Sequence, residues 1–417
     1  MIQNSLHKNY CSSTDKLSTW YAQKTQGLGL PFYSSYDIRD SGFKVANVDA
    51  NIFPAGFNNI CPTDKDYAIE IFAEAFRTRY GANDPQRIML VTEEHTNNPY
   101  YWENVLTIKS LMESSGRKVM IAIPRRMEQP LKVKSLTGVE IDVVSAFEDS
   151  VWVKEFKPEL IVSNNDFSEP YEEWAAQLTL PIDPPRELGW YQRKKSNYFK
   201  HYNALVEEFA GICGIDPFVL NVKTEIFENF DLADENQMKT LAERVDLMVA
   251  ELKAEYAKRG IQQEPVVFVK NNAGTYGLGV TMVKSGADVM EWNYKSRKKM
   301  KAAKGGREIH DVIVQEGIPS RVQADGATAE PVIYMVGCDL AGGFLRSHAE
   351  KSSTESLNSP GAVYKRLCVA DLQVNVEGSP LENVYGWSAR LGLLAIGMEA
   401  RDLGLRLRGR GCPTAGE

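Results

Sequence analysis

The sequence predicts an α/β protein with a mostly parallel sheet in its first half and antiparallel sheets in its second half. Three observations support this fold class. Two apolar strand-like runs flank a helix-like segment between residues 87 and 123, which is the spacing of a β–α–β unit. A glycine-rich loop joins two further strand-like runs between residues 266 and 283, as in an antiparallel hairpin. A proline cluster near residue 181 separates the two patterns.

The first half carries the β–α–β signal. A helix is expected from Lys65 to about Arg79, because Asp66 lies near its start and Gly81 follows its end. Residues 45–59 are interpreted as a short strand that opens into a loop. The other expected elements are a helix at Tyr101–Ser115 and strands at Arg87–Thr92, Val119–Ile123 and Glu159–Ser163.

The second half begins after Pro181, Pro184 and Pro185. A helix from about Glu235 to Arg259 has an apolar stripe that indicates core packing. The expected strands are Val266–Lys270, Val280–Val283, Asp311–Pro319, Pro331–Val336 and Gly342–Arg346, followed by a helix at Glu382–Arg401. With 417 residues, the chain is long enough for two or three packed units. We expect one domain over 1–185, a second over 186–403, and an atypical basic tail at 404–417 whose order the sequence leaves open.

Composition excludes several classes of protein. The net charge of -7 gives no electrostatic reason to bind nucleic acid. The longest apolar run is too short to cross a membrane, and the first residues are too polar for a signal peptide, so we expect a cytoplasmic protein without a membrane partner. The six cysteines form no Cys-x-x-Cys pair, and reduced thiols are the expected state. The five histidines lack the spacing of a transition-metal site.

Polar residues follow two of the expected strands. Glu93 to Asn98 come after the first strand, and Asn164 to Ser168 come after the third. Ligands of open α/β sheets bind beyond the carboxyl ends of the strands, so both segments are candidates for one binding crevice. Asn, Asp and Ser also cap helices, and the sequence leaves both interpretations open for each loop.

The glycine-rich segment carries the most chemical information. A strand-like run ends in Lys270, the loop from Gly274 to Gly279 follows, and a second strand-like run begins at Val280. Dinucleotide-binding and P-loop glycines open a helix, which does not fit a loop that leads into a strand. The loop can present backbone N–H groups to a polyphosphate while Lys270 supplies positive charge. A plain surface hairpin is the alternative interpretation.

The lysine strand, the glycine hairpin, the Gln-Glu-Gly-Ile-Pro segment and the Gly-Gly-Phe-Leu-Arg strand follow one another as in ATP-grasp enzymes. The resemblance covers about Lys195 to Arg366 and implies an ATP-grasp domain preceded by a pre-ATP-grasp-like domain. Lys194 and Lys200 are rivals of Lys195 for the first phosphate-binding lysine. The resemblance implies that ATP is bound by Lys195, Lys270, Gly274, Thr275, Tyr276, Gly277, Gly279, Gln315, Glu316, Gly317 and Ile318.

The same resemblance implies the catalytic and metal-binding groups. Arg346 is similar to the arginine that stabilises phosphoryl charge in the family, and Lys270 shares that catalytic role. Glu355 and Asn358 are similar to a Glu-x-Asn metal box with one extra residue, which implies Mg²⁺ ligands. The substrate loop of glutathione synthetases is the alternative for this segment. The acidic strand expected after the last helix is missing, and the basic tail from Gly404 takes its place.

Four segments together resemble a narrower family, the proteobacterial glutamate–cysteine ligases of ATP-grasp type. They are residues 53–60, 92–99, 189–196 and 355–361, and the resemblance extends to about Arg401. It implies that ATP drives the ligation of L-glutamate and L-cysteine to γ-glutamylcysteine, the first step of glutathione biosynthesis. Glu94 or His95 could accept a proton from the amine. The candidate substrate-binding residues are Asn58, Asn59, Glu94, Asn97, Asn98, Asn164 and Asn165.

Three alternatives stay open at this stage. A glutathione synthetase-like or other amino-acid ligase would keep the ATP residues and change only the amino-acid loops. A noncatalytic nucleotide- or carboxylate-binding protein of the same fold would explain the missing acidic strand. An α/β protein with a purely structural hairpin would bind no nucleotide. The sequence is compatible with a homo-oligomer and does not give the oligomeric state.

Overall fold

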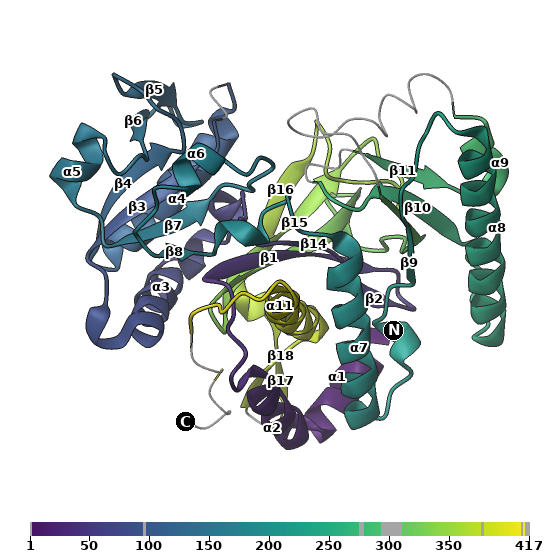
Figure 1. Ribbon diagram of the computed structural model, residues 1–417. Helices are drawn as coiled ribbons and strands as arrows, with labels where there is room; N and C mark the ends of the chain where they lie inside the picture. The colour runs from purple at the N-terminus through teal and green to yellow at the C-terminus, as the bar shows by residue number, and fades with distance from the viewer. Residues whose placement is uncertain are drawn as a thin grey trace.

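The computed structural model describes residues 2–94, 97–274, 279–292, 311–376, 379–409 and 412. Figure 1 shows three sheets side by side, with a mostly parallel sheet on the left, a long central sheet, and a small sheet on the right that is covered by the helix α8. The predicted fold class, α/β with a mostly parallel sheet followed by antiparallel sheets, is confirmed.

The mostly parallel sheet has the strand order β5-β6-β4-β3-β7-β8. Only the edge strand β5 runs antiparallel to its neighbour, β6. The buried residues of α3 and α4 form one core with its strands. Its strands are β3 (Arg87–Thr92), β4 (Lys118–Ile123), β5 (Leu131–Lys134), β6 (Glu140–Ser145), β7 (Leu160–Asn164) and β8 (Ile182–Asp183), and its helices are α3 (Lys65–Tyr80), α4 (Pro99–Ser114), α5 (Val151–Phe156) and α6 (Glu172–Ala175).

The small sheet is antiparallel and contains the predicted hairpin. Its order is β11-β10-β12-β9, and Lys270 pairs with Val280 across the hairpin. The helix α8 packs its apolar stripe on this sheet. Leu247, which the helical spacing also assigned to that stripe, is exposed. The elements are β9 (Thr224–Phe227), α8 (Glu235–Lys258), β10 (Val266–Asn271), β11 (Val280–Val283), α9 (Gly286–Met290) and β12 (Val312–Gly317).

The central sheet has the order β16-β15-β14-β1-β2, with β13 beside β14. It joins strands from the two ends of the chain, because β1 pairs antiparallel with β14 from Tyr33 opposite Val336 to Asp37 opposite Val332. Its strands are β1 (Tyr33–Asp40), β2 (Val45–Asn51), β13 (Gln323–Ala324), β14 (Ala327–Val336), β15 (Asp339–His348) and β16 (Val363–Leu367).

This pairing differs from the predicted division at residue 185. Residues 1–185 were expected to form one domain. The hydrogen bonds instead place β1 and β2 in a sheet with strands from the second half of the chain. The alternation of residues along a strand shows which face is buried but does not reveal the partner strand. The expected strand from residue 45 is present as β2, and β1 was not predicted.

Helices from both ends of the chain and one helix from its middle pack together beneath the central sheet (Figure 1). The described part of the tail belongs to this layer, since Leu405 and Leu407 pack against the same core. A small hairpin lies beside it, formed by β17 (Gln373–Val376) and β18 (Ser379–Glu382). The helices are α1 (Ile2–Ser12), α2 (Thr14–Thr25), α7 (Lys195–Cys213) and α11 (Val384–Asp402).

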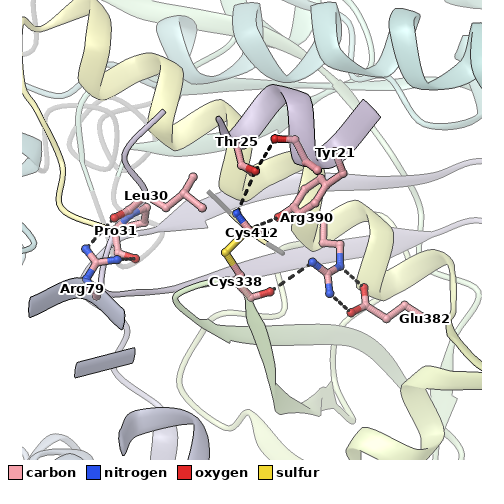
Figure 2. The surroundings of a disulfide bond; sticks show 10 residues. Tyr21, Thr25, Leu30, Pro31, Arg79, Cys338, Glu382, Arg390 and Cys412 are labelled. Atoms are coloured by element: carbon pink, nitrogen blue, oxygen red, sulfur yellow. Dashed lines mark hydrogen bonds and ion pairs between the residues drawn. A yellow bond between two sulfur atoms is a disulfide. The ribbon is translucent and has the colours of Figure 1, made fainter. Parts of the chain in front are cut away.

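Two disulfides correct the expectation of reduced thiols. Cys61 is bonded to Cys368, and Cys338 is bonded to Cys412, while Cys213 is a buried free thiol. The bonded partners are 307 and 74 residues apart, so local sequence spacing gave no sign of them. Figure 2 shows how the second disulfide holds the tail, with the backbone N–H of Cys412 donating to the hydroxyl of Thr25 at 3.0 Å.

The approach of α11 to the central sheet gives a testable prediction. A Cβ at Gly392 would lie 2.5 Å from the ring of Tyr36 and 2.8 Å from the hydroxyl of Tyr198. We expect Gly392→Ala to lower the free energy of unfolding by about 1–3 kcal/mol, because overpacking displaces both rings. The measurement is the urea unfolding midpoint.

The matched control is Gly211→Ala in α7, where a new Cβ would meet no atom within 4 Å. This change removes a helical glycine without a clash and should raise stability by about 0.5 kcal/mol. Equal midpoints for the two variants would contradict the tight contact between α11 and β1.

Candidate active site

Two cavities adjoin along the central sheet. The first, which we call the loop-side cavity, has a volume of about 330 Å³ and lies between the central sheet and the loops of the mostly parallel sheet. The second, the hairpin-side cavity, has a volume of about 80 Å³ and faces the β10–β11 hairpin. The residues that line both cavities are Asp37, Asp49, Arg346 and Asn358.

The loop-side cavity contains four of the predicted substrate-binding residues, Asn58, Asn59, Asn98 and Asn164. Asn58 and Asn59 come from a 3-10 turn at Phe57–Asn59. The side chain of Asn98 also caps α4 by accepting a hydrogen bond from the N–H of Tyr101, so the capping and cavity interpretations are both correct for this residue.

Three other predicted residues are not among the described residues that line this cavity: Glu94, Asn97 and Asn165. The amide of Asn165 donates to the carbonyl of Thr92 at 2.9 Å and accepts from the N–H of Phe167 at 2.8 Å, so it stabilises the loop. Glu94 lies 3.6 Å from Arg125 in an ion pair. His95 lies outside the described residues.

The cavity wall instead contains charged residues that the sequence analysis did not select. Glu93 and Asp166 supply carboxylates, and Arg193 supplies a guanidinium. Glu93 accepts a hydrogen bond from the N–H of Asp166 at 2.8 Å, which joins the two strand-end loops. The sequence signal was present, because both residues lie within the polar strand ends, but adjacent residues of an extended segment face opposite sides.

Arg193 is buried and firmly held. Its Nε lies 3.0 Å from both carboxylate oxygens of Glu399, and its Nη1 donates to the carbonyl of Ala50 at 2.6 Å. Its guanidinium carbon lies 4.7 Å from the ring centroid of Trp190. Burial raises the pKa of Glu399, and the ion pair with Arg193 opposes that rise. Arg193 therefore presents a fixed positive charge to the loop-side cavity.

The hairpin-side cavity gathers the predicted phosphate-binding lysines. Lys195, the first residue of α7, lies 2.5 Å from Asp49, and Lys270 of β10 donates to the side chain of Gln315 at 2.5 Å. The two rivals of Lys195 lie elsewhere. Lys194 is half-exposed and pairs with Asp311 at 3.0 Å, and Lys200 lines a different cavity.

Other predicted nucleotide-binding residues are placed in part. Gly274, Gln315, Glu316 and Ile318 line the hairpin-side cavity, whereas Gly279 and Gly317 are not among its described lining residues. Glu316 forms a buried ion pair with Lys44 at 2.7 Å. The remaining predicted residues, Thr275, Tyr276 and Gly277, lie outside the described residues.

Carboxylates and guanidinium groups alternate where the cavities meet. Nη1 of Arg346 lies 2.7 Å from Asp37 and 2.8 Å from Glu330, and Nε of Arg39 lies 2.5 Å from the other oxygen of Glu330. Burial raises the pKa of Asp37, and Arg346 opposes this rise. Burial alone would also raise the pKa of Asp49, but Lys195 holds it below the usual range.

Of the two predicted metal ligands, the structure places one beside the cavities and the other away from them. Asn358 lines both cavities, but Glu355 is not among the described residues that line either one. The carboxylate of Glu355 accepts from the N–H of Ser352 and pairs with Lys351, while its backbone carbonyl accepts from Arg39 at 2.8 Å. Two other carboxylates, those of Asp37 on β1 and Asp49 on β2, lie at the junction.

Comparison with known proteins decides the family. The sequence model of glutamate-cysteine ligase, named GshA, matches residues 7–400. The chain belongs to the glutamate-cysteine ligase family. A solved structure from Methylobacillus flagellatus KT, described as a gamma-glutamylcysteine synthetase, is 32% identical, with 96% of each chain covered and a TM-score of 0.82. No curated protein matches the chain.

More distant structures are also similar. A D-cycloserine synthetase is 13% identical over 77% of this chain and 83% of its own, with a TM-score of 0.37. A glutathione synthetase-like effector from Globodera pallida is 13% identical over 87% and 86% of the two chains, also with a TM-score of 0.37. Both values are too low to support an argument about this chain.

Membership of the glutamate-cysteine ligase family confirms the predicted function. The protein is a ligase that uses ATP to form γ-glutamylcysteine. Among the described residues, no helix is both long and apolar enough to cross a membrane. The roles of individual residues are proposals, and they are taken up below.

Lys270 gives a pH-dependent prediction for this glutamate-cysteine ligase. Burial lowers the pKa of Lys270 to about 8, so about half of the free molecules carry it uncharged at that pH. A bound polyphosphate favours the charged form. Nucleotide binding near pH 8 should therefore take up about half a proton, and affinity should fall as the pH rises further.

Calorimetry of ATP binding in buffers of different ionisation enthalpy measures this uptake. Lys270→Met should abolish it, whereas Lys194→Met, which removes an exposed lysine paired with Asp311, should retain it. Identical binding heats in all buffers for the unaltered protein would contradict the assignment of Lys270 to the phosphates.

Proposed function

We propose that the hairpin-side cavity binds ATP and that the loop-side cavity binds glutamate and cysteine, so that phosphoryl transfer occurs at their junction. One observation carries this proposal. Arg346, Asp37 and Asp49 line both cavities, so a phosphate in one cavity and a carboxylate in the other would meet beside the same charged groups. An arrangement of this kind suits a reaction that passes a phosphoryl group from a nucleotide to an amino acid.

The nucleotide site follows from the hairpin-side residues. Lys195 and Lys270 would bind the phosphates, and the backbone around Gly274 would cover them. The end of β12, from Glu316 to Ile318, would bind the adenine through its backbone N–H and C=O groups. The ion pair between Glu316 and Lys44 is buried on both sides, which fixes this segment.

The chemical steps use few protein groups. An oxygen of the glutamate γ-carboxylate attacks the γ-phosphorus of ATP, the bond to ADP breaks, and an acyl phosphate forms. The cysteine amine then attacks the acyl carbon, and phosphate leaves. Arg346 offsets the charge that develops on the transferred phosphoryl group. Glu93 and Asp166 line the cavity and can accept the proton that the cysteine ammonium must lose.

Substrate carboxylates need a cation of their own. The guanidinium groups among the described residues of the loop-side cavity are Arg193 and Arg346, and Arg346 contacts two carboxylates of the protein. Arg193 is therefore our candidate for an amino-acid α-carboxylate, with Asn58, Asn59 and Asn164 beside it. An amide both donates and accepts, so these side chains suit ammonium and carboxylate groups.

The junction also fits Mg²⁺. Asp37, Asp49 and Glu330 provide hard carboxylate oxygens, and Asn358 provides an amide oxygen, which is the donor set that Mg²⁺ prefers. When bound, Mg²⁺ neutralises phosphate charge as it develops. These residues replace the predicted pair of Glu355 and Asn358, of which only Asn358 reaches the cavities. We also propose the cytoplasm as the compartment of the reaction.

The first experiment measures phosphate release with ATP, Mg²⁺ and glutamate, with and without cysteine. Release should require both amino acids. Release that instead requires γ-glutamylcysteine and glycine would identify a glutathione synthetase and contradict the proposal.

Asp49→Asn tests the junction. Loss of one carboxylate should lower kcat roughly 100-fold, because charge stabilisation in such sites contributes factors of this size. Asp142→Asn, which alters an exposed carboxylate of β6 that pairs with Lys132 of β5, is the matched control and should keep full activity. Equal activity of the two variants would remove Asp49 from the reaction.

Arg193→Lys tests the carboxylate site. Lysine keeps the charge that Glu399 requires but loses the planar guanidinium, so the fold should survive while carboxylate binding weakens. The KM of one amino acid should rise about tenfold while the KM of ATP stays unchanged. An unchanged KM for both amino acids would contradict this role.

A further inference from the structure

We propose that Cys61 and Cys368 form a thiol–disulfide exchange site for low-molecular-weight thiols, and that the state of this bond sets the affinity of the loop-side cavity for its amino acid. The second part rests on the proposed function of that cavity. Three features carry the inference: the position of the bond, the groups around its two sulfur atoms, and the contrast with the other disulfide.

The bond joins two walls of the loop-side cavity. Cys61 follows the 3-10 turn that supplies Asn58 and Asn59 to the cavity, with one residue between them. Cys368 directly follows β16, which supplies Tyr364 to the same cavity. The two cysteines are 307 residues apart in the chain, so the covalent bond ties together wall segments that only the fold brings close.

A positive charge lies beside the two sulfur atoms. Nη2 of Arg366 is 3.3 Å from Sγ of Cys61 and 4.0 Å from Sγ of Cys368, and the hydroxyl of Thr63 is 2.9 Å from Sγ of Cys61. A cation and a hydroxyl stabilise a thiolate, which makes Cys61 a good leaving group in exchange. Asp64 is also close, and its carboxylate accepts a hydrogen bond from the N–H of Val369 at 2.8 Å.

Exposure favours one direction of attack. Cys61 is fully buried, whereas Cys368 is only half-buried, so an external thiolate reaches the sulfur of Cys368 first. That attack forms a mixed disulfide on Cys368 and releases the thiolate of Cys61 beside Arg366. The leaving sulfur is therefore the one with the shorter contact to the guanidinium.

The exchange balances without a further oxidant or reductant. A second external thiolate attacks the external sulfur of the mixed disulfide, which frees the thiolate of Cys368. Two small thiols are thereby oxidised to one small disulfide, and the protein disulfide is reduced to two thiols. The reverse steps close the bond again. Cysteine and γ-glutamylcysteine, the acceptor and product of this ligase, belong to the reacting class.

The other disulfide has different surroundings. Cys338 and Cys412 attach the tail beneath the central sheet, and the neutral hydroxyl of Tyr21 lies 3.7 Å from Sγ of Cys412 (Figure 2). Arg390 is nearby, but it donates to the backbone carbonyl of Cys338 and pairs with Glu382. Because these other groups engage Arg390, the Cys338–Cys412 pair is an internal control for the effect of Arg366.

Opening the bond should weaken amino-acid binding selectively. With the bond broken, the turn that bears Asn58 and β16 must be ordered by the ligand itself, which reduces affinity. The described residues that hold the hairpin-side cavity come from other segments, so ATP affinity should not change.

The experiment uses the full-length protein, oxidised and then reduced with a phosphine, with alkylation and mass spectrometry to identify the open bond. Calorimetry measures glutamate and ATP binding in each state. Reduction should weaken glutamate binding roughly threefold to tenfold and leave ATP binding unchanged. Cys338→Ser/Cys412→Ser should respond like the unaltered protein, and Cys61→Ser/Cys368→Ser should stay at the weaker level in both states.

A titration with cysteine measures the exchange itself. The Cys61–Cys368 bond should open at a lower cysteine concentration than the Cys338–Cys412 bond, and Arg366→Gln should slow its opening about tenfold by removing the charge beside the leaving sulfur. Equal glutamate affinity in the two states would overturn the control of binding while leaving the ligase assignment intact. Absence of glutamate binding in both states would overturn the proposed function as well.

Discussion

The antiparallel pairing of β1 with β14 is the interaction on which the rest of the structure depends. It inserts the β1–β2 hairpin, from the start of the chain, into a sheet whose other strands come from the second half. This pairing brings Asp37 and Asp49 close to Glu330 and Arg346. The proposed active site of this glutamate-cysteine ligase therefore combines strands from both halves of the chain.

The charged groups at the junction are paired in a similar way. Two of the three cations that would meet a phosphate already face a carboxylate of the protein: Lys195 faces Asp49, and Arg346 faces Asp37 and Glu330. Buried ion pairs contribute little net stability, because the cost of removing both charges from water offsets their attraction. We infer that these pairs are kept for binding, since a phosphate and its Mg²⁺ can take over the two halves of each pair.

Local structure was predicted well from the sequence, because it depends on neighbouring residues. The predicted strand Arg87–Thr92 and the β10–β11 hairpin are present, and α3 begins at Lys65 and ends one residue beyond the predicted position. Long-range pairing was not predicted, because the alternation of residues along β1 does not indicate that β14 is its partner strand.

The candidate site was likewise predicted only in part. Resemblance to a known family indicated Lys195, Lys270 and Arg346, and all three line the hairpin-side cavity. It also named Glu94 and Asn165, whereas Glu93 lines the cavity and the amide of Asn165 is used within its own loop. A shift of one residue along an extended segment changes the face that a side chain occupies, and composition carries no information about that choice.

The most direct test is a crystal structure of the protein with a nonhydrolysable ATP analogue and Mn²⁺, in which anomalous scattering locates the metal. We expect Mn²⁺ at the junction of the two cavities, with Asp49 and at least one of Asp37 and Glu330 as direct ligands. Mn²⁺ bound by Glu355, with the carboxylates of β1 and β2 away from it, would contradict the claim that the N-terminal strands complete the active site.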